Sequence, residues 1–276
     1  MSEKEVIERT ERPATIDSIA ADLGALGVKP GTTVLVHSSL SALGWVSGGA
    51  VAVVHALQAA LGQSGTLVMP SHSNGLSDPA KWVDPPVPET WWHLIRATMP
   101  SYDPRFTPTI LGAVAEVFRS FPGVLRSAHP HYSFTAIGSQ AERILSGHEL
   151  DYGLGEDSPL ARIYEAGGSV LLLGTGHDVN TSMHLAEYRA QWPDKKIFRT
   201  GAPMVVGGER RWVEFDDLDL DSSDFTRIGD DLERSSTAVG RGPVAGGEAA
   251  LMSQPAVVDH AVRWIEANRV PAAMRT

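Results

Sequence analysis

The chain has 276 residues, a formal net charge of −10 at pH 7 and no cysteine. The lack of cysteine excludes disulfide bonds, a thiolate nucleophile and a zinc site built on cysteine. No stretch approaches the roughly 18 apolar residues of a membrane-spanning helix, and the first residues are too charged for a signal peptide. We therefore expect a cytoplasmic protein. Its negative charge argues against nucleic acids and membranes as partners and is compatible with a cationic ligand.

The first 70 residues predict a βαβ unit. Amphipathic spacing predicts a helix over residues 15–27, and apolar runs predict strands at 33–37 and 65–70. A Ser- and Gly-rich loop at 38–49 and an apolar helix at 50–61 connect the two strands. Strand, helix and strand in this order imply a parallel sheet, so we expect an α/β fold. We expect one domain over the whole chain, with its core between about residues 15 and 268.

Residues 78–108 interrupt this pattern with seven of the 18 prolines and three of the seven tryptophans. Proline fixes the backbone and tryptophan supplies a large apolar surface, so we predict an ordered excursion with a helix near 89–97. Further helices are predicted at 109–121, 159–166, 181–191 and 255–268, and strands at 134–137, 169–173 and 212–215. The two ends, residues 1–12 and 270–276, are expected to be frayed.

His184 is the first candidate catalytic residue. It lies in the first turn of the helix at 181–191, just after the buried strand at 169–173, where open α/β sheets bind ligands. A helix N-terminus disfavours the imidazolium, which keeps the ring neutral and able to accept a proton. Glu187 lies on the same helical face. The pattern predicts a general base, and a packed or surface histidine is the alternative.

Residues 214–233 form an acidic run, with nine carboxylates and one basic residue, Arg227. If the strand at 212–215 continues, alternation places Asp217, Asp219 and Asp221 on one face. Carboxylates stacked in this way repel one another unless cations lie between them. The run is therefore expected to bind a polyamine or a metal ion, and a solvated surface segment is the alternative.

A catalytic metal is a further interpretation of the same segments. His177, His184 and Glu187 are possible zinc ligands, which Asp217 and Asp219 would complete. The sequence contains no His-Glu-x-x-His motif, so no metal cofactor is predicted.

The loop at residues 38–49 precedes a helix, where backbone amides attract anions. It suits an extended cofactor that carries phosphate, and a plain connection is the alternative. The Gly-x4-Gly-Lys-[Ser/Thr] motif, the third glycine of a dinucleotide fingerprint (Val179 takes its place) and the Gly-x-Ser-x-Gly motif are all absent. Arg126, in a polar turn, is a second candidate for contact with a cofactor phosphate.

These segments together resemble the aminoglycoside 3-N-acetyltransferase family, whose fold is not that of the GNAT acetyltransferases. The matching segments cover about residues 15–268 in family order: His37–Gly49, Gly65–His72, Trp82–Trp92, Asp103–Thr109, Arg126–Pro130, Gly153–Arg162, Leu171–Glu187 and Phe215–Asp219. The similarity is greatest to the branch that modifies gentamicin-like 4,6-disubstituted drugs. It implies a layered α/β/α domain with a mostly parallel central sheet and a Pro/Trp-rich, partly helical excursion at 78–108.

The resemblance also implies roles for individual residues. It implies acetyl-CoA as co-substrate and a polycationic aminoglycoside as partner. His184 is the implied catalytic base, Asp219 or Asp217 its carboxylate partner, and Thr181 the hydroxyl that faces the thioester. The implied cofactor-binding residues are Ser38, Ser39, Ser41, Leu43, Gly44, Trp45, Val46, Ser47, Gly49, Thr107, Thr109, Arg126 and Ser127. The implied contacts to the drug are Asp78, Glu187, Asp217 and Asp219.

The expected reaction is direct transfer of acetyl to the 3-amino group of the 2-deoxystreptamine ring, assisted by His184, which confers antibiotic resistance. One alternative is an enzyme of the same fold that acetylates a non-drug amine. Two others are a metal-dependent hydrolase and a non-catalytic protein that sequesters polycations.

Overall fold

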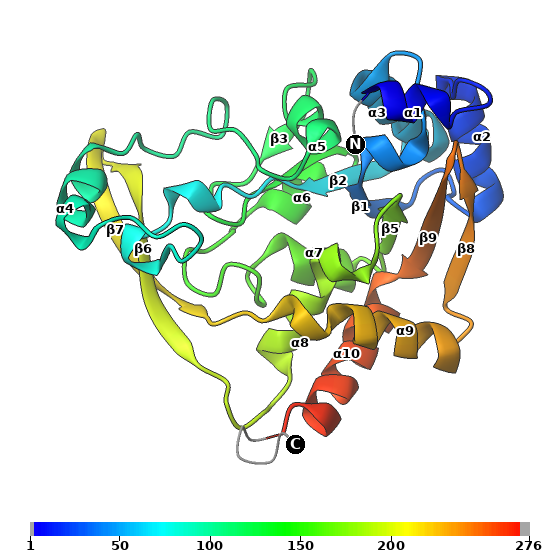
Figure 1. Cartoon of the computed structure of the whole chain (residues 1–276). Coiled ribbons are helices and arrows are strands. Elements are labelled where there is room, and N and C mark those ends of the chain that lie inside the picture. The colour runs from blue at the N-terminus through cyan, green and yellow to red at the C-terminus, as the bar shows by residue number, and fades with distance from the viewer. Residues whose placement is uncertain (1–2, 271–276) are drawn as a thin grey trace.

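The computed structural model describes residues 3–270 and centres on a seven-stranded sheet (Figure 1). In spatial order the strands are β3 (Leu125–Arg126), β4 (Phe134–Gly138), β2 (Thr66–Pro70), β1 (Thr33–Ser38), β5 (Ser169–Leu173), β9 (Gly247–Ser253) and β8 (Val239–Val244). β1 is parallel to both β2 and β5, whereas β4 and β9 are antiparallel to both of their neighbours. Five of the seven strands therefore run in one direction, which confirms the mostly parallel sheet.

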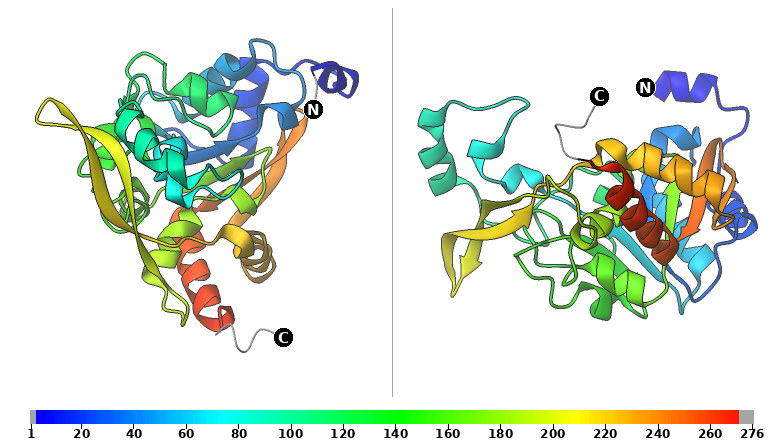
Figure 2. Two further views of the ribbon diagram at one scale, coloured as in Figure 1. Left: turned by 60° about the vertical axis from the view of Figure 1, so that its left-hand side comes forward. Right: turned by 90° about the horizontal axis from the view of Figure 1, so that it is seen from below.

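Helices cover both faces of this sheet, as expected for a layered α/β/α fold (Figure 2). One face carries α2 (Ile16–Leu26), α3 (Gly49–Leu61) and α5 (Ala113–Phe118). The other carries α6 (Ala141–Leu145), α7 (Pro159–Glu165), α8 (Ser182–Arg189), α9 (Phe225–Ser235) and α10 (Gln254–Asn268).

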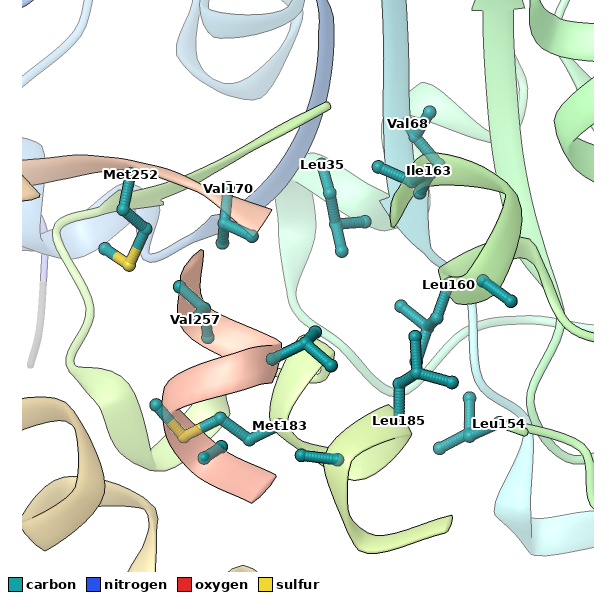
Figure 3. Packing of buried hydrophobic residues seen from close by; sticks show 14 of the residues in the cluster. Leu35, Val68, Leu154, Leu160, Ile163, Val170, Met183, Leu185, Met252 and Val257 are labelled. Carbon is teal, nitrogen blue, oxygen red and sulfur yellow. The ribbon is translucent and has the colours of Figure 1, made fainter. Parts of the chain in front are cut away.

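The alternation of side chains in the strands builds the two cores. In β1, Leu35 joins one apolar cluster while Val34 and Val36 join the other. Figure 3 shows the first cluster, in which Leu35 and Val170 of the sheet meet residues of α7, α8 and α10. Each aliphatic side chain buried in this way contributes about 1.5–3 kcal/mol to folding. Because apolar side chains pack on both faces, the sheet is held rigidly, and the carboxyl ends of the parallel strands β1, β2 and β5 lie together at one edge.

A long hairpin, β6 (Ile197–Val206) and β7 (Glu209–Leu218), extends away from the sheet and is paired with the Pro/Trp-rich excursion (Figures 1 and 2). Arg210 donates hydrogen bonds to the carbonyls of Arg96 and Met99, at 2.6 and 2.8 Å. The amide of Tyr102 donates to the carbonyl of Pro203 at 2.9 Å. The excursion is thus ordered, and its predicted helix is α4 (Glu89–Thr98).

Several sequence predictions need correction. The helix expected at 109–121 is only α5, because Gly112 enters it with a φ of 90°. Residues 3–12 are not frayed: α1 (Glu3–Glu8) buries Val6, and the hydroxyl of Thr10 accepts a hydrogen bond from the amide of Trp45 at 2.9 Å. β3, β6, β8, β9, α6 and α9 were not predicted. Residues 271–276, within the second predicted frayed end, lie outside the described residues.

No helix between residues 3 and 270 is both long and apolar enough to span a membrane.

Candidate active site

A pocket of about 340 Å³ opens at the carboxyl edge of the parallel strands β1, β2 and β5. Each of these strands, or the segment directly after it, contributes side chains to the pocket wall. The contributing residues are Val36, His37, Ser38, Pro70, His72, Thr175, Asp178, Val179, Thr181 and His184, with Leu111, Ala115 and Ser222 closing the wall. This is the edge at which open α/β sheets bind ligands, and it contains the predicted base.

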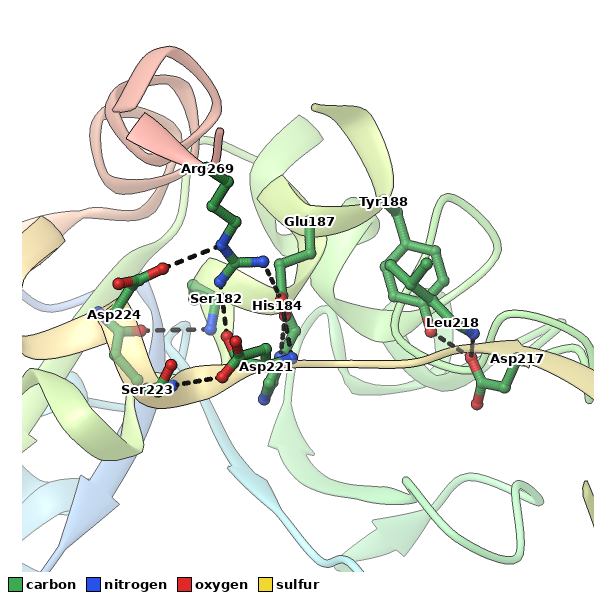
Figure 4. Close-up of polar contacts among 11 residues, drawn as sticks. Ser182, His184, Glu187, Tyr188, Asp217, Leu218, Asp221, Ser223, Asp224 and Arg269 are labelled. Carbon is green, nitrogen blue, oxygen red and sulfur yellow. Dashed lines mark hydrogen bonds and ion pairs between the residues drawn. The ribbon is translucent and has the colours of Figure 1, made fainter. Parts of the chain in front are cut away.

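His184 is held by a carboxylate of its own helix (Figure 4). Its Nδ1 lies 2.6 Å from Oε2 of Glu187, three residues later in α8, and its ring packs against Phe225. A carboxylate can only accept hydrogen bonds, so Nδ1 carries the proton and Nε2 of the neutral ring carries a lone pair. Among residues 3–270 no hydrogen-bond partner of Nε2 is found. The side chain remains 17% exposed, which leaves Nε2 available to a ligand in the pocket.

Both carboxylate oxygens of Glu187 are occupied, although the residue is completely buried. Oε2 accepts from His184, and Oε1 accepts from Nη1 of Arg269 at 2.7 Å and from the amide of Asp221 at 2.9 Å. A buried carboxylate is stable only when it is paired and fully hydrogen-bonded, and here it is both. Glu187 is therefore a fixed acceptor for the imidazole.

This pairing corrects the one predicted from the sequence, in which Asp217 or Asp219 held His184 and Glu187 contacted the drug. β7 ends at Leu218, so the alternation that placed the aspartates on one face does not continue. Asp219 is exposed beyond the end of the strand. Glu187 instead lies one helical turn from His184, at the spacing where side chains of a helix meet.

Asp217 forms a separate buried pair, away from His184 (Figure 4). It accepts hydrogen bonds from the hydroxyl of Tyr188 and from the amide of Leu218, the latter at 2.8 Å. Burial raises the pKa of Asp217 to about 6, and these two hydrogen bonds oppose the rise. A carboxylate with no exposed surface is closed to a drug in solution.

Thr181 lies in the pocket wall at the start of α8. Its Oγ1 is 3.2 Å from Nε2 of His37, which projects from β1. Burial, and to a smaller extent the neighbouring His184, lowers the pKa of His37 to about 3, so this ring is neutral. Thr181 is the N-cap of the helix, and Oδ1 of the preceding Asn180 accepts a hydrogen bond from the amide of Ser182 at 3.2 Å.

The predicted cofactor loop forms most of a second cleft, of about 530 Å³. Seven of its nine predicted residues line that cleft: Ser38, Ser39, Ser41, Gly44, Trp45, Val46 and Gly49. Leu43 does not, because it is buried in the apolar core, and neither does Ser47, whose amide donates to the carbonyl of Ala14. Ser38 lines both the cleft and the His184 pocket, so the two adjoin there.

The turn between β5 and α8 packs closely against this loop. Gly174 has a φ of +70°, and a Cβ on it would lie 2.7 Å from Cβ of Ala42. A side chain at this position would force the loop and the pocket apart, which explains the glycine in physical terms.

The other four predicted cofactor residues form a scaffold beneath the pocket. Arg126 donates to Ser133 and to the carbonyls of Ser71, Pro104 and Thr107, and Ser127 is buried and hydrogen-bonded to Phe134 and His148. The hydroxyl of Thr109 donates to the carbonyl of His72 at 3.0 Å, and that of Thr107 accepts from the amide of Asp103. These groups form hydrogen bonds within the chain and line neither the pocket nor the cleft.

The predicted drug contacts are scattered. Asp78 belongs to the excursion and is paired with Arg96 at 2.7 Å, while Glu187 and Asp217 are buried. Of the four, only Asp219 is exposed and without a side-chain ion pair among the described residues. The carboxylate that does line the pocket, Asp178, was not selected from the sequence.

Three further residues of the site were missed. His37 and His72 follow the same pattern, a histidine at the carboxyl end of a strand, and this signal was available in the sequence. Arg269 had no such signal, because it is separated from Glu187 by 82 positions and directly precedes an end expected to be frayed.

No group of three or more histidine and acidic side chains within residues 3–270 is arranged to hold a metal ion.

Comparison with known proteins finds relatives over nearly the whole chain. The family model described as aminoglycoside 3-N-acetyltransferase matches residues 35–266. The aminoglycoside N(3')-acetyltransferase-like protein YokD of Bacillus subtilis is 47% identical, over 96% of this chain and 97% of its own. Aminoglycoside N(3)-acetyltransferase VIII of Streptomyces fradiae is 39% identical, over 99% of each chain.

Solved structures share the whole fold. The crystal structure of YokD superimposes with a TM-score of 0.94 at 46% identity, covering 99% of this chain and 100% of that one. The structure of AAC-IIIb with CoASH has a TM-score of 0.84 at 32% identity, covering 95% and 100%. AAC-VIa bound to sisomicin also has a TM-score of 0.84, at 30% identity and with 94% and 100% covered. With its fold, its pocket histidine and these relatives, the chain belongs to the aminoglycoside 3-N-acetyltransferase family.

Proposed function

We propose that the protein transfers the acetyl group of acetyl-CoA to the 3-amino group of the 2-deoxystreptamine ring of an aminoglycoside, which inactivates the drug. The observation that carries this proposal is His184 in the pocket wall, with Nδ1 bound to buried Glu187 and Nε2 left for substrate. The relatives supply the substrate classes, since one solved neighbour binds CoASH and another binds sisomicin.

Coenzyme A occupies the cleft of the Ser38–Gly49 loop in this proposal. The cleft meets the His184 pocket at Ser38, so a thioester carried on a flexible arm reaches the base from that side. Backbone amides of the loop and the N-terminus of α3 attract anionic groups such as the phosphates of coenzyme A. Arg126, Ser127, Thr107 and Thr109 act indirectly, by fixing the segments around the cleft.

The chemical step requires one proton acceptor. The neutral 3-amine attacks the thioester carbonyl carbon, and Nε2 of His184 takes the proton that the nitrogen loses. The C–S bond then breaks, and the imidazolium returns the proton to the departing thiolate, so that the products are the acetamide and free coenzyme A. Glu187 stabilises the imidazolium and holds the ring in its orientation.

Thr181 is proposed to stabilise the developing oxyanion. Nε2 of His37 accepts a hydrogen bond from the amide of Thr181 at 3.4 Å and lies 3.2 Å from its Oγ1, so His37 holds Thr181 in the pocket wall. Rotation about the Cβ–Oγ1 bond then lets the hydroxyl proton point into the pocket when substrate binds. A donor fixed in this way is worth about 10²- to 10³-fold in rate in other acyl-transfer sites.

The drug is a polycation and needs anionic neighbours. Asp178 lies in the pocket wall and Asp219 is exposed at the end of β7, so we propose these two as the carboxylates that meet its ammonium groups.

Thiol release from acetyl-CoA in the presence of gentamicin tests the proposal, with the product's acetylation site assigned by NMR. We expect acetylation at the 3-amine and no loss of rate with a chelator. His184→Gln should lower kcat by about 10²- to 10⁴-fold while coenzyme A still binds. Release with simple amines but with no aminoglycoside would reassign the enzyme to a non-drug substrate, and full activity of His184→Gln would remove the base.

A further inference from the structure

Arg269 follows α10 directly and extends its guanidinium into the interior (Figure 4). Its side chain is only 5% exposed. Nη1 donates to Oε1 of Glu187 at 2.7 Å, Nη2 to the carbonyl of Asp221 at 2.6 Å, and Nε to Oδ2 of Asp224 at 3.1 Å. The guanidinium also lies 5.1 Å from the ring of Trp192. One side chain thus joins α8, the segment after β7 and the end of α10.

The three contacts differ in what they reach. The contact to Asp224 ends on a side chain that is 20% exposed and that also meets Arg227. The contact to Glu187 ends on a carboxylate with no exposed surface, whose other oxygen holds His184. Among residues 3–270, Arg269 is the only arginine or lysine whose side chain pairs with Glu187.

We propose that Arg269 is a positioning residue for His184 and acts through Glu187; this rests on the proposed role of His184 as the base. Without the guanidinium, Oε1 of Glu187 keeps only the amide of Asp221. The carboxylate then either turns about its last bond or takes up a proton, and in both cases it becomes a poorer acceptor for Nδ1–H. The ring of His184 loses its fixed orientation, although Arg269 lines neither the pocket nor the cleft and substrate binding does not depend on it.

Arg269→Gln, Arg269→Lys and the control Asp224→Asn test this in the full-length protein. Asp224→Asn removes the same guanidinium's other ion pair and leaves Glu187 untouched. The readouts are kcat, KM for acetyl-CoA and gentamicin, the Kd of coenzyme A, and the proton NMR signal of Nδ1–H of His184, identified by its loss in His184→Gln.

We expect Arg269→Gln to lower kcat roughly 10- to 100-fold, the usual effect of removing a group that orients a functional ligand, with KM and Kd unchanged. The Nδ1–H signal should broaden or move upfield. Arg269→Lys should recover part of kcat because it restores the charge, and Asp224→Asn should stay near the parent value.

An unchanged kcat and NMR signal in Arg269→Gln would overturn the proposal. So would an equal loss in Asp224→Asn, since that result would make Arg269 a tether of the C-terminal segment. If Arg269→Gln does not fold, kcat of Arg269→Lys is compared with kcat of Asp224→Asn, because lysine keeps the charge but cannot donate to all three acceptors. A lower kcat in Arg269→Lys supports the proposal, and equal values overturn it. Full activity of His184→Gln would refute the proposed function instead, and the NMR signal would still report whether Arg269 orders the ring.

Discussion

Nδ1 of His184 and Oε2 of Glu187 are 2.6 Å apart within one helix, so a single turn of α8 contains both the proposed base and the group that holds it. The pair needs no other element to set its spacing, because residues three apart share a helix face. What the rest of the fold contributes is burial of the carboxylate and a counter-charge for it.

Glu187→Gln should therefore lower kcat by about 10²-fold or more, since an amide cannot stabilise the imidazolium and can present the wrong group to Nδ1. Asp217→Asn is the matched control, because its carboxyl contacts Tyr188 and not His184. Steady-state kinetics of both variants should show a much larger loss for Glu187→Gln. Equal losses would restore the partner predicted from the sequence.

Asp178→Asn should raise KM for gentamicin with little change in kcat, because one anionic neighbour of the cationic drug is lost from the pocket wall. The effect should shrink as salt is added, since screening weakens exposed charges. Glu165→Gln changes the charge equally but lies at the end of α7, directly before β5 and so at the opposite edge of the sheet. An equal rise in KM for that variant would mean that only net charge matters.

The folded protein should lose stability as the pH falls from about 6.5. Burial lowers the pKa of His131 and of His148 to about 4, and it also depresses the pKa of His72 and of His129. A histidine with a depressed folded-state pKa binds its proton more readily when unfolded. Its contribution is therefore complete above the unfolded value of about 6.5 and is lost progressively as the pH falls toward its folded-state pKa, which is about 4 for His131 and His148, at up to roughly 1.4 kcal/mol per pH unit for each ring.

Urea unfolding between pH 7.5 and 4.5 measures this loss. His148→Gln should make the dependence on pH shallower, whereas His93→Gln, a change at an exposed position on α4, should leave the slope as it was. A free energy of unfolding that is flat over this range would show that the four rings titrate normally.

Gly229→Ala should destabilise the protein even though alanine favours helices. A Cβ on Gly229, within α9, would lie 2.0 Å from the ring of His177, which is itself hydrogen-bonded to Glu233 at 2.7 Å. Gly24→Ala is the matched control: Gly24 is also helical, in α2, and a Cβ there meets nothing within 4 Å. Thermal melts should show that the free energy of unfolding falls by about 1–3 kcal/mol in Gly229→Ala and rises slightly in Gly24→Ala. Similar melting temperatures would mean that the ring of His177 moves aside at little energetic cost.

Arg126→Gln should lower the unfolding midpoint more than it weakens coenzyme A binding. The guanidinium bridges the carbonyls of Ser71 and Thr107, so its loss breaks the link between these two segments and leaves the Ser71 carbonyl with only the hydroxyl of Ser133. Calorimetry of the folded variant with coenzyme A separates the two effects. A large rise in Kd with normal stability would return Arg126 to the cofactor site.

Local patterns predicted the parallel centre of the fold well. β1, β2 and β5 are short apolar runs bounded by turn residues, and α3 and α10 have clear ends, so their positions followed from the sequence. β6 did not, and of β7 only the central residues 212–215 were predicted, because exposed arginines and acidic residues interrupt the alternation of these strands and the two stabilise each other by pairing. The stacking of Asp217, Asp219 and Asp221 depended on the strand continuing past 215, whereas the strand ends at Leu218 and α9 contains most of the second half of the acidic run.

The site was predictable to the same extent. His184 and the loop at 38–49 were candidates because ligands of such folds bind where a strand ends and a helix starts, and the structure places both in the walls of the pocket and the cleft. The partner of His184 could not, since the sequence alone does not show that Asp217 is directed toward Tyr188 and Glu187 inward. The role of Arg126 could not be decided from the sequence for a related reason: an arginine in a turn is equally suited to phosphate and to backbone carbonyls, and here its guanidinium donates to carbonyls.

The position of Arg269 has a consequence for how the enzyme is made. Glu187 leaves the ribosome 82 residues before the guanidinium that neutralises it, and α10 must dock before the two can meet. A nascent chain that has folded its sheet as far as β5 still has a carboxylate without its cation. Closing such a long loop carries an entropy cost that is recovered only at the end, so we expect catalytic competence to be among the last properties acquired during synthesis.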